Sequence, residues 1–258
     1  MNRIFEITIP QIIHITIPAY ALFTFVGLFC MMLFLYFRVQ KIELSFALFL
    51  VLIAFMIIGV GIGSKFLFVL TKLPDILSDF SIGKTLHIII ISGFVFYGGL
   101  FGAIIGLWLF SKAFKLSFSV LSDIVSPGFP LFHLWGRIGC FFAGCCYGKE
   151  ASWGFALQDE PNVLRIPIQL FESFFLLCIF LILIGLEKRE HRSAPLLYAY
   201  LFLYSICRFV LEFYRGDEVR GIWFGLSTSQ WISIGIFVYI IWQLLKIRQA
   251  ATAYYSEE

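Results

Sequence analysis

The amino-acid sequence predicts an all-α integral membrane protein with about seven transmembrane helices. Of the 258 residues, 60% are hydrophobic and 14% are charged, and the mean hydropathy is +0.94. A soluble domain is about half apolar and one quarter charged. The apolar residues also form long runs, and about 20 such residues span a hydrocarbon core about 30 Å thick. These observations exclude a soluble globular protein.

Seven apolar runs define the expected spans of a single transmembrane domain, residues 1–258. They lie near residues 18–37, 45–63, 86–110, 118–136, 166–186, 194–213 and 230–246. Pro127, Gly128 and Pro130 interrupt the fourth run, so we expect a broken, glycine-rich segment there, buried in protein or lining a wet cavity. The first run follows no signal-peptide cleavage site, so we expect it to remain in the mature protein.

The basic residues predict the topology. With seven spans, one face carries basic residues close to helix ends: Arg38, Lys41, Lys112, Lys115, Lys188, Arg189, Arg192, Lys246 and Arg248. The other face mixes basic and acidic residues. The positive-inside rule makes the first face cytoplasmic, which places the N-terminus outside and the C-terminus inside. The net charge of +3 is too small to indicate a nucleic-acid partner.

Tyr204, Arg208 and Glu212 form the first group of polar residues in an apolar run. Their i, i+4, i+8 spacing places them on one helix face, where Arg208 and Glu212 can pair. An arginine at the centre of a membrane helix costs at least about 2.5–3.5 kcal/mol, so such a residue usually has a partner or a function. A structural ion pair is one reading, and an anion site that binds phosphate through the guanidinium fork is the other.

A glycine-rich stretch, residues 136–148, is the second group. Arg137 follows Gly136 at its head, which suggests a phosphate or carboxylate contact, because glycines let backbone approach a ligand closely. The alternative is a re-entrant turn whose arginine only satisfies backbone carbonyl groups.

Two further groups open the fifth and third spans. Gln169 and Glu172 lie one turn apart and fit either a helix cap or a ligand site. Gly98, Gly102 and Gly106 form a small-residue ridge for close helix packing, next to Tyr97, whose hydroxyl needs a partner.

The six cysteines divide into two sets. Cys30, Cys178 and Cys207 are single residues in apolar runs and fit packing roles. Cys140, Cys145 and Cys146 are clustered, and a disulfide, a reactive thiol and small-residue packing remain open for them. We expect no metal, because His133 is the only close additional ligand candidate.

Several motifs, in order along the chain, resemble the prolipoprotein diacylglyceryl transferase family. They are Tyr20 to Leu22, Ser92 to Gly102, Gly136-Arg137, Pro167 to Glu172, Tyr204 to Arg215 and Leu226 to Gln230. The resemblance implies seven spans in a bacterial inner membrane, with the N-terminus outside. It also implies transfer of a diacylglyceryl group from phosphatidylglycerol to the lipobox cysteine of a secreted prolipoprotein. Glycerol phosphate leaves, and no metal or soluble cofactor takes part.

The resemblance also implies roles for individual residues. Arg137 and Arg208 would hold the phosphate and stabilise the leaving group, with Tyr204 and Glu212 beside them and Tyr97 at the position of the family's catalytic histidine. The residues expected to shape the lipid and acceptor site are Tyr20, Gly98, Gly99, Gly136, Cys140, Cys145, Gln169 and Glu172.

The chain departs from the family pattern at four positions. Tyr97 and Ile166 replace histidines, Cys140 replaces an asparagine, and Cys145 replaces an acid. A tyrosine with a pKa near 10 is a poorer base for a thiol than a histidine near 6.5. Two alternative functions are therefore kept. One is a different lipid-linked or thiol-based reaction, and the other is a non-catalytic protein that binds or transports anionic lipid.

Overall fold

The computed structural model describes residues 4–9, 13–73, 76, 95–188, 195–217 and 222–256. Backbone contacts divide the chain into two units, Met1–Leu35 with Val125–Glu258 and Tyr36–Ile124, which are described separately. Helices dominate, in agreement with an all-α membrane protein. Five helical stretches within the described residues are long and apolar enough to cross a membrane: Ala19–Ile42, Phe46–Thr71, Phe96–Ala113, Ile168–Glu187 and Thr228–Gln249.

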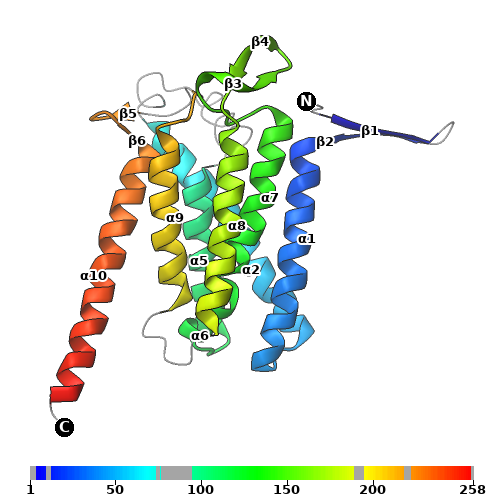
Figure 1. Ribbon diagram of the computed structural model, residues 1–258. Helices are drawn as coiled ribbons and strands as arrows, with labels where there is room; N and C mark the ends of the chain where they lie inside the picture. The colour runs from blue at the N-terminus through cyan, green and yellow to red at the C-terminus, as the bar shows by residue number, and fades with distance from the viewer. Residues whose placement is uncertain are drawn as a thin grey trace. The chain divides into compact units, whose positions relative to one another are not determined.

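The first unit contains most of α1 (Ala19–Val39) and a row of helices. These are α7 (Gly128–Ala143), α8 (Ile168–Glu187), α9 (Leu196–Glu212) and α10 (Thr228–Ser256). In this row α8 packs between α7 and α9, and α10 packs on α9 (Figure 1). The arrangement brings polar residues from three separate segments of the chain to neighbouring helices.

Three short antiparallel hairpins, which the sequence analysis did not predict, complete this unit. They are β1 (Ile4–Ile9) with β2 (Ile13–Pro18), β3 (Glu150–Leu157) with β4 (Glu160–Arg165), and β5 (Ile222–Trp223) with β6 (Leu226–Ser227). The β3–β4 hairpin lies between α7 and α8 in the chain. It therefore connects two helices that carry candidate site residues.

A reciprocal cap starts α10 directly after β6. The backbone N–H of Gln230 donates to Ser227 Oγ at 3.2 Å, and the N–H of Ser227 donates to Gln230 Oε1 at 2.9 Å. This capping box satisfies two N–H groups that a helix start leaves without intrahelical partners. The Gln230 side-chain amide also donates to the Phe209 carbonyl oxygen at 3.4 Å, which ties α10 to α9.

The predicted fourth span, residues 118–136, contains two helices with different ends from those expected. α6 (Phe118–Val125) stops at Val125, and α7 continues past residue 136 to Ala143. Gly139 keeps α7 close to α1, because a Cβ there would lie 3.1 Å from Phe23 Cβ. Gly144 then ends the helix at φ 70°, and Cys145 N–H bonds the Cys140 carbonyl oxygen at 3.1 Å. Arg137 and Cys140 are thus helical, whereas the sequence analysis ended the fourth span at residue 136.

The second unit is organised by the pair α2 (Phe46–Thr71) and α5 (Phe96–Ala113). α2 extends beyond the predicted end at residue 63, because Gly63 and the buried Ser64 take part in the helix contact. The glycine ridge of α5 faces α2, and a Cβ on Gly102 would overlap the Gly59 carbonyl group. The packing interpretation of these glycines is correct. Residues 86–94 of the third predicted span lie outside the described residues.

Replacing Gly102 by Ala should lower the thermal stability of the purified protein, because the added methyl group forces α2 and α5 apart. Gly61→Ala is the matched control on α2, since a Cβ at Gly61 meets no atom within 4 Å in the described structure. Gly61→Ala should leave the stability unchanged or raise it by up to about 1 kcal/mol, the difference in helix propensity. Thermal unfolding in detergent measures both. Equal effects of the two substitutions would contradict the close packing.

Candidate active site

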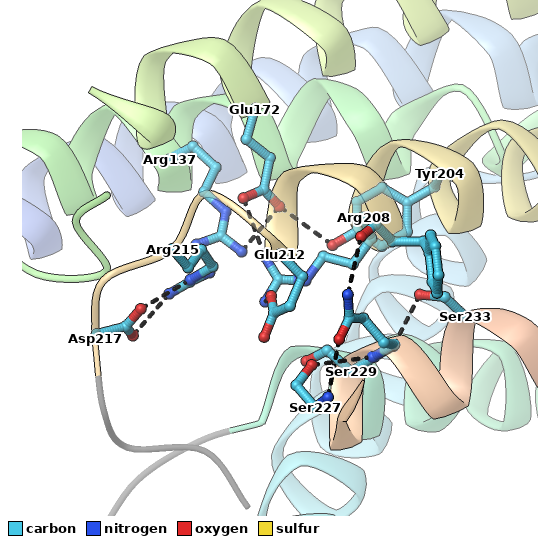
Figure 2. A network of polar contacts seen from close by, with 12 residues as sticks. Arg137, Glu172, Tyr204, Arg208, Glu212, Arg215, Asp217, Ser227, Ser229 and Ser233 are labelled. Atoms are coloured by element: carbon cyan, nitrogen blue, oxygen red, sulfur yellow. Dashed lines mark hydrogen bonds and ion pairs between the residues drawn. The ribbon is translucent and has the colours of Figure 1, made fainter. Parts of the chain in front are cut away.

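The carboxylate of Glu172, on α8, lies between two arginines from the neighbouring helices. Glu172 Oε1 is 3.0 Å from Arg137 Nη2 on α7, and Oε2 is 3.2 Å from Arg208 Nη1 on α9 (Figure 2). The Tyr204 hydroxyl donates to Oε1 at 3.3 Å. All four residues are buried, and Glu172 is 1% exposed. The two arginines that the sequence analysis singled out therefore meet at one carboxylate.

A second carboxylate completes the charge balance of this cluster. Glu212 Oε2 is 2.7 Å from Arg208 Nη2, so the predicted i, i+4 pair forms on α9. Two guanidinium groups then face two carboxylates, and their charges sum to zero. Breaking one buried pair leaves an uncompensated charge, which is strongly destabilising. Each carboxylate consequently fixes the position of an arginine.

His133 also belongs to this cluster, although the sequence analysis considered it only as a metal ligand. It lies one turn before Arg137 on α7, and Arg137 Nε donates to His133 Nε2 at 3.2 Å. The same nitrogen is 3.9 Å from Glu172 Oε1, and the imidazole packs edge-on against Tyr204 with ring centroids 5.4 Å apart. Because Nε2 accepts a hydrogen bond, the imidazole holds an unprotonated nitrogen beside the arginines. The sequence offered one sign of this contact, because His133 and Arg137 are four residues apart and so lie on the same helix face.

Arg215 brings a further guanidinium group, just beyond the end of α9. Its Nε and Nη2 donate to the two oxygens of Asp217 at 3.0 and 2.9 Å, the planar fork typical of Arg–carboxylate pairs. Burial alone would lower the pKa of Arg215, but the bonds to Asp217 raise it above its ordinary value. Arg215 is therefore a permanent positive charge.

Gln169 connects the start of α8 to the turn after α7. Its side-chain Nε2 donates to the Cys145 carbonyl oxygen at 2.8 Å. The residue is 1% exposed, and Oε1 finds no hydrogen-bond donor among the described residues. A buried acceptor without a donor is costly, so a ligand hydroxyl at this atom would satisfy it. One end of the amide fixes the turn, and the other end is suited to a ligand.

The cysteines form a compact group next to Arg137. Cys140 is buried in the last turn of α7, Cys145 is exposed, and Cys146 is half-buried at φ 56°. The Cys145 thiol donates to the Cys140 carbonyl oxygen at 3.7 Å, and the three sulfur atoms all lie within 4.8 Å of one another.

The other predicted site residues lie on α1, on α7 and at the start of α5. Tyr20, on α1, is half exposed, and its backbone faces Gly139 of α7. A Cβ added at Gly136 would meet no described atom within 4 Å, so helix packing does not explain this glycine. Tyr97, Gly98 and Gly99 belong to the second unit, at the start of α5, where Tyr97 stacks on Phe101. Their assignment to the site remains a prediction.

Comparison with known proteins gives consistent matches. A family model described as prolipoprotein diacylglyceryl transferase matches residues 8–246. A phosphatidylglycerol–prolipoprotein diacylglyceryl transferase of Clostridium tetani is 35% identical over 196 residues, 72% of this chain and 77% of that protein. A protein of Clostridium perfringens with the same name, numbered 2, is 33% identical over 240 residues, 90% of this chain and 92% of that protein. A Chlorobaculum tepidum protein of that name is 38% identical over 134 residues, 50% of this chain and 46% of its own.

Glu172→Gln should destabilise the protein by about 3–5 kcal/mol, because it leaves two buried arginines without their shared carboxylate. Glu212→Gln is the matched comparison and should cost less, since it removes one contact of Arg208 while Glu172 stays in place. Thermal and denaturant unfolding in detergent would rank the two variants. If Glu212→Gln were the more damaging, Glu172 would not be the centre of the cluster.

Proposed function

The chain belongs to the prolipoprotein diacylglyceryl transferase family, and on this basis we propose that it transfers a diacylglyceryl group from phosphatidylglycerol to the lipobox cysteine of a secreted prolipoprotein. It is accordingly a transferase and a multi-pass membrane protein. We place it in the bacterial cytoplasmic membrane with the N-terminus outside. The observation that carries the proposal is the buried cluster in which Glu172 holds Arg137 and Arg208 side by side.

The proposed reaction is a substitution at carbon. The cysteine sulfur of the prolipoprotein attacks the carbon of the diacylated glycerol that bears the phosphate ester. A C–S bond forms, the C–O bond breaks, and the bonding electrons leave on the phosphate oxygen of glycerol phosphate. The thiol proton passes to a base. Negative charge therefore develops on the phosphate, where cationic donors have the largest effect.

Arg137 and Arg208 have the donors that this phosphate requires. Their described contacts engage Nε and Nη2 of Arg137 and both terminal nitrogens of Arg208. A guanidinium carries five N–H donors, so each arginine retains donors beyond these contacts. Glu172 and Glu212 hold the two groups in place, and Tyr204 orients Glu172. These carboxylates therefore act as positioning residues.

Gln169 is suited to the glycerol head of the lipid. Its Oε1 is buried next to Glu172 in the first turn of α8 and can accept a hydrogen bond from a glycerol hydroxyl. This contact gives a hydroxylated head group an advantage over one without hydroxyls. It supports phosphatidylglycerol as the donor lipid.

His133 supplies a base in the cluster itself. Its Nε2 accepts a hydrogen bond from Arg137 Nε. When Arg137 moves to bind the lipid phosphate, this hydrogen bond breaks and Nε2 accepts the thiol proton. An imidazole is better matched to a thiol near neutral pH than the phenol of Tyr97.

The reaction is tested with purified protein, phosphatidylglycerol labelled in its glycerol head and a synthetic lipobox peptide. We expect release of glycerol phosphate with a matching mass gain on the peptide. Arg137→Lys and Arg208→Lys should each lower kcat by about 10²–10³, the cost of losing one donor to a developing anion. Lys246→Ala, which removes an exposed cation from α10, is the control and should have no effect.

Two outcomes of this assay would contradict the proposal. Release of glycerol phosphate with an unmodified peptide indicates a different acceptor. Binding of phosphatidylglycerol without release indicates a protein that binds or transports anionic lipid.

The base assignment is tested by comparing His133→Gln with Tyr97→Phe. His133→Gln should lower kcat at pH 7 by about 10²–10⁴, the range for loss of a general base, and should remove the decline in kcat/KM at acidic pH. Tyr97→Phe should keep that acidic decline. The pH profile of each variant decides between them. An unchanged acidic decline in His133→Gln would exclude His133 as the base.

A further inference from the structure

The cysteine cluster at the end of α7 has a geometry that the transfer reaction does not use. The Sγ atoms of Cys140, Cys145 and Cys146 all lie within 4.8 Å of one another. Cys140 is buried, Cys146 is half-buried and Cys145 is exposed. The cluster therefore extends from the protein interior to the surface.

The backbone, rather than attraction between the thiols, brings the sulfur atoms together. Gly144 and Cys146 both have left-handed conformations, with φ of 70° and 56°, and Cys145 lies between them. The Cys145 N–H bonds the Cys140 carbonyl oxygen at 3.1 Å, which folds the chain back onto the last turn of the helix. Gln169 then fixes the turn from α8 through the Cys145 carbonyl oxygen. Hydrogen bonds at the N–H and at the carbonyl oxygen of Cys145 thus fix the turn that holds the three thiols close together.

This spacing is close to that of a three-thiolate metal site. Zn–S bonds of about 2.3 Å at tetrahedral angles place ligand sulfur atoms about 3.8 Å apart. The cysteine sulfur atoms lie within 4.8 Å of one another, about 1 Å from that separation. Thiolates select soft cations such as Zn²⁺ and Cu⁺ over Mg²⁺ or Ca²⁺.

The surrounding charges suit such a complex. Three thiolates around a divalent cation carry one net negative charge. The positive charges of Arg137 and Arg215 both act on Cys146. Both arginines already have carboxylate partners, so they lower the cost of that negative charge without neutralising it.

We propose that Cys140, Cys145 and Cys146 together bind one soft d10 cation, with Zn²⁺ as the representative, through three thiolates. Three S–H bonds break as three metal–sulfur bonds form, the protons pass to solvent, and no electrons are transferred. Solvent can fill the fourth coordination position, because Cys145 lies at the surface. The sequence analysis expected no metal because it sought a fourth protein ligand such as His133. An open three-ligand site does not need one.

The test uses the full-length protein in detergent, reduced with a phosphine and kept free of oxygen. Cd²⁺ serves as the probe, because cadmium–thiolate complexes absorb in the ultraviolet. It binds the same ligands as Zn²⁺ and displaces it. We expect a charge-transfer band that saturates at a single Cd²⁺ per chain, and that needs more Cd²⁺ to reach saturation when the protein is first loaded with Zn²⁺. The absence of such a band would overturn the proposal.

Substitutions identify the ligands. Cys140→Ser, Cys145→Ser and Cys146→Ser should each weaken Cd²⁺ binding by at least about tenfold, since even outer-shell partners of metal sites contribute about 10–100-fold. The combined variant Cys30→Ala, Cys178→Ala and Cys207→Ala removes the other cysteines and should keep the band. A band that survives Cys145→Ser, or that the combined variant loses, would refute the assignment.

A second measurement needs no variant and therefore does not depend on folding of the mutants. Zn²⁺ should slow the labelling of Cys145 by a maleimide, and a chelator should restore it, as read by peptide mass spectrometry. Unchanged labelling, or a Cys140–Cys145 disulfide in protein purified without reductant, would contradict the metal site. These measurements contain no lipid or peptide substrate, so their failure leaves the proposed transfer reaction untouched.

Discussion

The contact on which the candidate site depends is the carboxylate of Glu172 between Arg137 and Arg208. An ionisable group among membrane helices is expensive unless it is paired, and here each oxygen of one carboxylate neutralises a different arginine. The pairing joins α7, α8 and α9, so it fixes both the relative positions of these helices and the spacing of the two guanidinium groups. Stability and anion binding therefore depend on the same residues, which limits how far either can change independently.

Local patterns in the sequence were sufficient to predict that the chain is mostly helical and that Arg208 pairs with Glu212, because both depend on residues within a few positions of each other. The contact of Glu172 with Arg208 joins residues 36 positions apart, and no periodicity encodes it. The glycines of α7 were misleading, since glycine-rich sequence resembles a loop when the neighbouring α1 that requires Gly139 is not yet known. His133 was overlooked for a related reason. A single histidine in an apolar run becomes informative only when Arg137 is seen to bond its Nε2.

The first unit places two chemically different groups on one short segment. Arg137 begins the last two turns of α7 and belongs to the charged cluster around Glu172, which is proposed to bind phosphate. Three thiols form a second cluster at the end of the same helix, those of Cys140, Cys145 and Cys146. Gln169 contacts the segment between them and lies one turn before Glu172. Movement of the turn after α7 would thus be transmitted through one buried amide to the start of α8. A cation held by the thiols would stiffen this turn, and with it the acceptor oxygen of Gln169.

The charges of Arg137, Arg208, Glu172 and Glu212 are balanced, and this balance constrains how the cluster can bind an added phosphate. Glu172 and Glu212 already balance both arginines, so an incoming phosphate adds negative charge to a site with no excess positive charge among these four groups. Arg215, just after α9, stays positively charged because the bonds to Asp217 raise its pKa. Its charge is already paired with Asp217. In the proposed mechanism, the proton that His133 takes from the thiol adds one positive charge beside the leaving phosphate. The base and the anion site are then two parts of one electrostatic requirement, because the proton taken from the nucleophile stabilises the leaving group.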